Sequence, residues 1–362
     1  MYWEALYPND SMMYLGEALF PAEKTYKTEI NWFKGYKQQV AVLQLSALDT
    51  KPNLRDRIGV KELSEKIPFF RESMRLDETT RRDLQDALKR NEDNPEYQAQ
   101  VLQPTFDDVG NLVSGGFAVL EKMRMAALFF GKIEFKVASD TGRKAHKEIN
   151  YDPSGEWTDN NNTVLTGTSA WTVANKATST PIQDIQAQVK QARMNGKTVV
   201  TLLMNSNTYD GMVASESIPK AINPIGSANA IYTEDQLVTF VESMAKVKIV
   251  IYDKHYLDEN QNQKLFVPDG YTALLPAGTL GKTKIGLTPE EYDLLGAKTE
   301  VATGKDAPNG NVACTVVRNG LGPTIVTEKT AVPINIITTV SLTGLPTFEM
   351  MDSVYVMNVW GD

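Results

Sequence analysis

One segment of the sequence has the appearance of a phosphate-binding loop. It runs from Pro276 to Thr283 and ends in a Gly-Lys-Thr triplet, which such loops use to hold the phosphates of a nucleotide. The motif needs glycine where Pro276 stands, and a helix must follow its last residue. Here the next helix start lies further on, at Thr288. We therefore expect no nucleotide site, although Lys282 is the residue that a nucleotide-dependent enzyme would use.

Side chains for acid–base or metal chemistry are few. The chain has two histidines, His146 and His255, and the sequence gives neither a convincing partner. An acidic group of Asp253, Asp258 and Glu259 lacks the glycine and the regular spacing of a calcium loop, so a polar hairpin tip is the simpler interpretation. These patterns predict no catalytic residue, no metal and no cofactor.

Cys314 is the only cysteine, and it lies in a run of strand-forming residues. One cysteine permits neither a disulfide bond within the chain nor a thiolate metal cluster. We expect it to behave as a small apolar residue.

The composition excludes several classes of protein. Of the 362 residues, 42% are hydrophobic and 23% are charged, which is typical of a folded globular chain with room for two domains. The net charge of -8 argues against tight, sequence-specific DNA binding, because that requires a surplus of basic residues. The sequence shows neither the apolar run of a signal peptide nor a membrane span, so we expect no export and no membrane partner.

Residues 1–36 contain nine aromatic residues without helical or strand periodicity. A segment of this kind either packs on the core of its own chain or crosses onto a neighbouring copy, since aromatic anchors dominate interface energetics. The second alternative makes five of these residues candidates for a subunit interface: Trp3, Tyr7, Tyr26, Trp32 and Phe33.

The next segment is predicted to form a long two-stranded excursion. Strand-like runs at 40–45 and 67–76 flank a polar stretch, 46–65, which is typical of a solvated hairpin tip. An isolated hairpin is marginally stable in water, so it needs a surface to lie on. The candidate interface residues here are Arg55 and Arg57 at the tip and Phe69 and Phe70 on the second strand.

Helical patterns follow. We predict a helix over 77–90, a second start at Asn94-Pro95, an interruption at Pro104 and then a long helix ending near Phe130. A half-exposed strand is expected at 133–137, and a polar stretch ends at a domain boundary near residue 180.

The second half alternates helices and strands, which favours a compact α+β domain. Three helix starts have the spacing of a capping box: Thr180 with Gln183, Thr233 with Gln236, and Thr288 with Glu291. The expected strands are 198–204, 247–252, 271–275, 334–342 and 353–360.

This order of elements resembles the major head proteins of tailed phages with the HK97-like fold, and within them the lambda-type major head protein family. Three stretches carry the resemblance: Phe20-Pro21-Ala22-Glu23-Lys24-Thr25-Tyr26, Phe129-Phe130-Gly131-Lys132, and Val247-Lys248-Ile249-Val250-Ile251-Tyr252 followed by Leu265-Phe266-Val267-Pro268-Asp269. Their order and spacing matter more than any one of them.

The resemblance implies a domain plan and a set of partners. Residues 1–36 are the N-terminal arm, 37–76 the extended loop, 77–180 the peripheral domain with its spine helix, and 181–362 the axial domain, whose last strands partly return to the peripheral domain. It implies a capsid subunit of the virion, assembled in the host cytoplasm, that forms hexamers and pentamers of an icosahedral head around double-stranded DNA. Other implied partners are a separate scaffolding protein, a portal and a decoration protein. The alternatives are an encapsulin-like nanocompartment shell and a nucleotide-dependent enzyme.

Overall fold

The computed structural model describes residues 14–34, 61–90, 95–137, 145–223, 232–258, 260–293, 301–302, 314–318, 322–329 and 335–361. The chain folds into two compact units and passes between them repeatedly. Unit 1 combines residues 1–30, 65–123 and 283–346, and unit 2 combines 31–64, 124–282 and 347–362. Segments far apart in the sequence therefore share each core.

Unit 1 is built on a seven-stranded sheet. Its elements are α2 (Leu15–Leu19), β1 (Ala22–Lys24), β4 (Phe69–Leu76), α3 (Glu78–Arg90), the first part of α4 (Pro95–Phe130), β13 (Thr283–Ile285), α10 (Pro289–Asp293), β14 (Val301–Ala302), β15 (Cys314–Arg318), β16 (Thr324–Lys329) and β17 (Ile336–Pro346). The strand order is β1-β13-β17-β16-β15-β14, and β4 also pairs with β17. The eleven-residue β17 is thus the strand that joins the sheet together.

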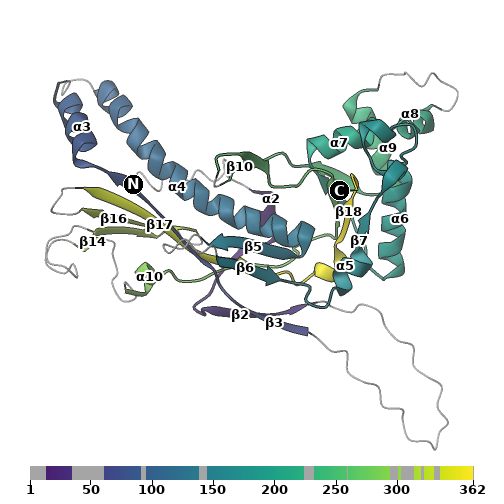
Figure 1. The fold of residues 1–362 in the computed structure, drawn as a ribbon, viewed down its shortest axis with the longest axis horizontal. Helices are drawn as coiled ribbons and strands as arrows, with labels where there is room; N and C mark the ends of the chain where they lie inside the picture. The colour runs from purple at the N-terminus through teal and green to yellow at the C-terminus, as the bar shows by residue number, and fades with distance from the viewer. Residues whose placement is uncertain are drawn as a thin grey trace, which may run out of the picture. The chain divides into compact units, whose positions relative to one another are not determined.

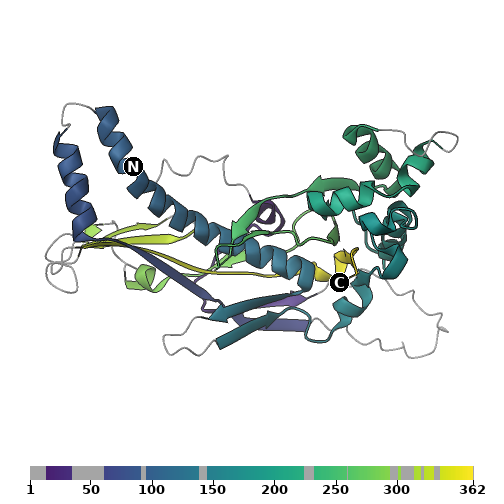
Figure 2. The same ribbon diagram turned by 45° about the horizontal axis from the view of Figure 1, so that its top comes forward.

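The first part of α4 covers this sheet. Val113 packs against Ile325 of β16 and Val340 of β17, and all three side chains are buried. Figures 1 and 2 both show the helix running along these two strands. At Gly116 a Cβ atom would lie 2.7 Å from Pro323, so only glycine permits this close approach.

The predicted interruption of this helix at Pro104 is wrong. α4 continues through Pro104. The whole helix has 36 residues and is roughly 54 Å long at 1.5 Å per residue. A proline removes one backbone donor, and the remaining hydrogen bonds of a long helix maintain it despite that loss. The helix predicted over 77–90 is confirmed as α3, where Asp77 Oδ1 accepts a hydrogen bond from the Thr80 N–H at 2.8 Å.

Unit 2 has a five-stranded sheet with the order β7-β18-β12-β8-β9. Its strands and helices are β5 (Lys132–Val137), β6 (Ala145–Asn150), α5 (Glu156–Asn161), β7 (Asn162–Val164), α6 (Pro181–Met194), β8 (Thr201–Met204), α7 (Ser206–Val213), α8 (Ser217–Ile222), α9 (Glu234–Ala245), β9 (Lys248–Ile251), β10 (His255–Leu257), β11 (Gln263–Leu265), β12 (Tyr271–Leu275) and β18 (Tyr355–Asn358), with short 3-10 turns at Gly167–Ser169, Val173–Asn175 and Met351–Ser353. The helices α6 to α9 lie together beside this sheet (Figure 1). Buried side chains such as Ile185, Val241 and Leu202 join helices and sheet in one core.

Most predicted strands are present, with shifted ends. The patterns at 133–137, 198–204, 247–252 and 271–275 correspond to β5, β8, β9 and β12, and the last two predicted strands correspond to β17 and β18. The sequence did not predict β16, which pairs with β17 over its whole length.

Two of the three predicted capping boxes are confirmed. Thr233 and Gln236 cap α9 reciprocally, and the Thr288 N–H donates to Glu291 Oε2 at 3.1 Å while the Glu291 N–H donates to Thr288 Oγ1 at 3.4 Å. The box at Thr180 is wrong. α6 does begin there, but the Thr180 side chain makes no capping bond, because ψ of 64° takes its backbone away from the extended conformation of a capping residue.

The strands of the predicted two-stranded excursion have other boundaries in the structure. β2 (Glu29–Lys34) pairs with β3 (Lys61–Lys66), so residues 61–65, predicted as part of the polar tip, form a strand. The second predicted strand begins at Phe69 rather than at residue 67. The predicted strand at 40–45, together with Arg55 and Arg57, lies outside the described residues.

Candidate assembly surface

The arm is bound to unit 1 by a short parallel strand pair. β1 lies beside β13 with Ala22 opposite Thr283 and Lys24 opposite Ile285. The Thr283 hydroxyl donates to the carbonyl oxygen of Phe20 at 2.8 Å. The Phe20 ring is fully buried. This part of the arm therefore packs on its own subunit.

Charged groups reinforce this attachment. Lys284 Nζ lies 2.7 Å from Glu23 Oε1, and Lys24 Nζ lies 3.9 Å from Glu291 Oε1. Nearer the N-terminus, the Gly16 N–H donates to the buried Glu121 of α4. These contacts are partly buried and add to the strand pairing and to the burial of the Phe20 ring.

The aromatic candidates in the arm fall into different classes. Trp32 is buried, and its ring lies 5.5 Å from that of Tyr151, so at this position the structure favours packing on the chain's own core. Tyr26, in contrast, is 69% exposed. The side chain of Phe33, and Trp3 and Tyr7 altogether, lie outside the described residues.

β4 is an exposed strand of the seven-stranded sheet in unit 1. It pairs with β17 from Ile336 opposite Leu76 to Thr343 opposite Phe69. No other strand in the described ranges pairs with its opposite edge. Six of its eight residues are exposed and two are half-buried, so side chains on both of its faces meet solvent. Long exposed edge strands are rare in proteins that remain single, because they offer unpaired backbone groups to other chains.

The two aromatic candidates on β4 lie on opposite faces of this strand. Phe69 is 42% exposed, and the Arg71 guanidinium carbon lies 4.8 Å from the centre of its ring. Phe70 is half-buried. Arg71 also forms an ion pair with Glu290 of α10. Burial raises the pKa of the Glu290 carboxyl, but hydrogen bonds and the Arg71 charge outweigh this and lower the pKa below its usual value.

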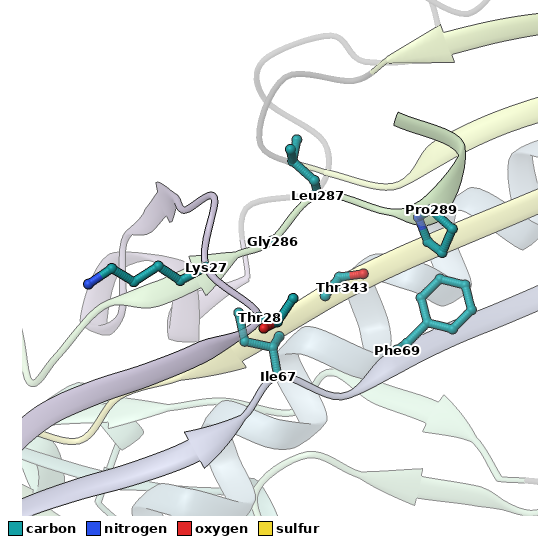
Figure 3. A pocket seen from close by; sticks show the side chains of 8 residues that line it. All are labelled: Lys27, Thr28, Ile67, Phe69, Gly286, Leu287, Pro289 and Thr343. Carbon is teal, nitrogen blue, oxygen red and sulfur yellow. The ribbon is translucent and has the colours of Figure 1, made fainter. Parts of the chain in front are cut away.

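A pocket of about 210 Å³ lies beside β4 in unit 1 (Figure 3). Its lining residues are Lys27, Thr28, Ile67, Phe69, Gly286, Leu287, Pro289 and Thr343. A Cβ atom at Gly286 would lie 2.9 Å from Thr343 Cγ2, so glycine keeps β17 and the strand end at Ile285 close together. Sites for small molecules measure roughly 300–1,000 Å³, which makes this pocket better suited to a side chain than to a metabolite.

Sequence reasoning missed several residues of this surface. Arg71 and Met74 lie on the predicted strand, but β4 has no apolar face whose alternation would single them out. Leu287 and Pro289 come from a segment more than 200 residues later, and their place next to Phe69 depends on pairing with β17. Only the exposed aromatic residues gave a usable signal.

The residues that could have supported catalysis or ligand binding have local structural surroundings instead. Asp253 Oδ1 accepts the Ser206 N–H at 2.7 Å, and His255 is exposed at the start of β10. The backbone N–H of Asn262 is the largest cause that lowers the pKa of Asp258, to about 2. After Thr283 the chain forms β13 rather than a helix, unlike a phosphate-binding loop. The described residues hold no group of three metal-binding side chains.

The stretches that carried the family resemblance have structural roles. Phe20 and Pro21 begin the arm's attachment to β13. Gly131 adopts a positive φ of 64° where α4 ends, against Trp157 and Met351. Asp269 accepts hydrogen bonds from the side-chain amides of Asn205 and Asn207, which fixes the turn before β12.

A comparison with protein families decides what kind of protein has this surface. The model of the family described as phage major capsid protein E matches residues 8–303. The chain belongs to this family. The capsid protein is therefore a structural subunit of the phage virion, and the resemblance seen in the sequence is confirmed.

One of the similar solved structures, a phage capsid, supports the fold. The capsid of cyanophage A-1(L) is similar with a TM-score of 0.50 and 13% identity, over 96% of this chain and 92% of that one. A phage-related protein from Bordetella bronchiseptica RB50 has a TM-score of 0.48 and 13% identity, with the same coverage. A putative prophage capsid protein from E. coli CFT073 has a TM-score of 0.47 and 12% identity over 83% and 79%. A search of curated proteins found no match.

The capsid protein thus has the predicted α+β, HK97-like fold. None of the helices in the described ranges is both long and apolar enough to cross a membrane.

Proposed function

We propose that this capsid protein builds the phage head through β4 and the neighbouring surface of unit 1. The observation that carries this proposal is the exposure of β4, an eight-residue edge strand whose side chains meet solvent on both faces. Copies joined through such surfaces form the hexamers and pentamers of an icosahedral head around double-stranded DNA. Closed shells need repeated contacts of this kind, and obligate interfaces bury on the order of 2,000 Å² or more.

The proposal keeps the domain plan that the family implies. The arm is 1–36, the extended loop 37–76, the peripheral domain 77–180 and the axial domain 181–362. The proposed partners beyond other copies of the chain are a separate scaffolding protein, a portal and a decoration protein. The role is structural, without an enzymatic activity, and the DNA inside is held without sequence-specific contacts.

Replacing two exposed side chains on β4 tests this role. Phe69→Ser combined with Met74→Ser removes two apolar side chains that are 42% and 39% exposed in the single subunit. The variant should therefore still fold. We expect a normal circular dichroism spectrum together with the loss of particles in electron microscopy. Met194→Ser, at a residue 73% exposed in unit 2, is the control and should leave particle yield unchanged.

The outcome separates the possibilities clearly. Wild-type particle yield from the double variant would remove β4 from the assembly surface. Purified particles also distinguish a phage head from a nanocompartment: a head contains DNA when the remaining phage components are expressed with it, whereas a nanocompartment contains protein cargo. A chain that stays monomeric and binds ATP through Lys282 would support the enzyme alternative instead.

A further inference from the structure

The pocket beside β4 has the character of a socket for a protein side chain. Ile67, Phe69, Leu287 and Pro289 give it apolar walls, and Figure 3 shows Lys27 at the edge of the lining residues, with its side chain extending away from them. Its volume of about 210 Å³ is below that of metabolite sites. Interfaces commonly place an aromatic anchor in a pocket of this kind, and such anchors carry much of the binding energy.

We propose that this pocket receives an aromatic side chain from residues 1–13 of a second copy of the chain. The inference rests on the proposed function, because it assumes that copies meet at β4. Phe69 belongs both to β4 and to the pocket, so the socket is continuous with the proposed assembly surface.

The acidic groups near the pocket are already paired. Glu290 pairs with Arg71, Glu291 lies 3.9 Å from Lys24 Nζ, and Glu23 binds Lys284. The ammonium group of Lys27 has no acidic partner among the residues that the structure describes. The rim therefore offers one uncompensated positive charge to an incoming segment.

Residues 1–13 match this socket in charge and in side chains. They contain Glu4 and Asp10 and no lysine or arginine, and they supply the rings of Tyr2, Trp3 and Tyr7. The competing segment is the stretch 35–60 of the extended loop. It contains four basic and two acidic residues and one aromatic residue, so it matches Lys27 less well.

Cysteine trapping between two differently tagged chains tests the proposal in assembled particles. Both chains carry Cys314→Ala, which leaves each with one introduced cysteine. One chain carries Tyr2→Cys, Trp3→Cys or Tyr7→Cys, and the other carries Thr343→Cys in the pocket. Mild oxidation should give a covalent heterodimer for at least one of the three positions. Val173→Cys, 71% exposed in unit 2, replaces Thr343→Cys as the control and should give none.

Each outcome bears on a different statement. Normal particles without a heterodimer at any position would overturn the pocket assignment and leave the proposed function intact. Failure of the reduced, wild-type chain to form particles would overturn the proposed function itself. A chain carrying both cysteines that closes an internal disulfide, with no covalent dimer, would show that the segment occupies the pocket of its own copy and would also overturn the inference.

Reversing the rim charge provides a second test. Lys27→Glu should lower the heterodimer yield about two- to fivefold, the size expected for one exposed ion pair. Adding Glu4→Lys and Asp10→Lys to the arm of the other chain should restore the yield. Lys190→Glu, on the exposed side of α6, is the control. An unchanged yield with Lys27→Glu would contradict the electrostatic part of the inference.

Discussion

The backbone N–H of Gly16 donates a hydrogen bond to Oε1 of Glu121, 3.0 Å away and 105 residues later in the chain. Both residues are buried, so loss of the acceptor leaves an unpaired donor. We expect Glu121→Ala to lower the free energy of unfolding by about 1–3 kcal/mol. Amide hydrogen exchange should become faster at 15–20. Glu121→Gln keeps an oxygen acceptor and should preserve most of the protection; equal exchange in the two variants would show that this bond does not hold α2.

Gly131 allows the chain to turn sharply where α4 ends. Its φ is 64°, and a Cβ atom there would lie 2.8 Å from Met351 Cε and 2.9 Å from Trp157. Gly131→Ala combines a left-handed backbone with overpacking, so we expect a loss of about 2–5 kcal/mol in urea unfolding. Gly167→Ala is the matched control, because its φ is 60° but nothing lies within 4 Å of the new methyl group. Gly167→Ala should lower the free energy of unfolding by only about 1–2 kcal/mol. Similar losses in both variants would rule out overpacking as a cause at residue 131.

Asn205 connects three segments of unit 2. Its Nδ2 donates to the carbonyl oxygen of Val267 at 3.1 Å and to Asp269 Oδ1 at 2.6 Å, while its Oδ1 accepts the Thr208 N–H at 2.8 Å and caps α7. We expect Asn205→Ala to destabilise the fold by about 2–4 kcal/mol in thermal or urea unfolding. Asn207→Ala removes one exposed contact to the same carboxylate and should cost much less. Equal losses would mean that burial of Asn205 is unimportant.

Asp258 makes the β10–β11 hairpin sensitive to strong acid. Hydrogen bonds from the Asn262 and Asn260 N–H groups and the charge of Lys264 hold its pKa at about 2. Because the folded pKa is below the unfolded value, the carboxylate's contribution is complete above about pH 4 and is lost as pH falls through about 2. An NMR titration of the Asp258 carboxyl carbon should give this midpoint. A midpoint near 4 would contradict the turn geometry.

Sequence patterns correctly predicted the helices and strands that are stabilised by residues within or next to the element itself. α3 has its own capping aspartate, and α9 has a complete capping box. β5 alternates apolar and charged residues as a half-exposed strand does. In contrast, β3 contains a single apolar residue among four charged residues and a serine, so its strand conformation depends on pairing with β2. No periodicity in its own six residues indicates that partner.

The candidate surface was predictable only in part. Exposed aromatic residues such as Tyr26 and Phe69 were found because their types are common at interfaces. Trp32 has the same character in the sequence, yet its ring is buried. The pocket could not be predicted, because it brings Lys27, Phe69 and Thr343 together from three distant segments.

The pairing of β4 with β17 also sets the timing of folding during synthesis. Leu76 lies opposite Ile336, and 260 residues separate them in the chain. At ribosomal rates of about 5–20 residues per second, β4 waits roughly 10–50 s before its partner emerges. During that interval both edges of the strand are open to other nascent chains. We therefore expect productive yield to depend on chaperones that shield this strand until translation is nearly complete.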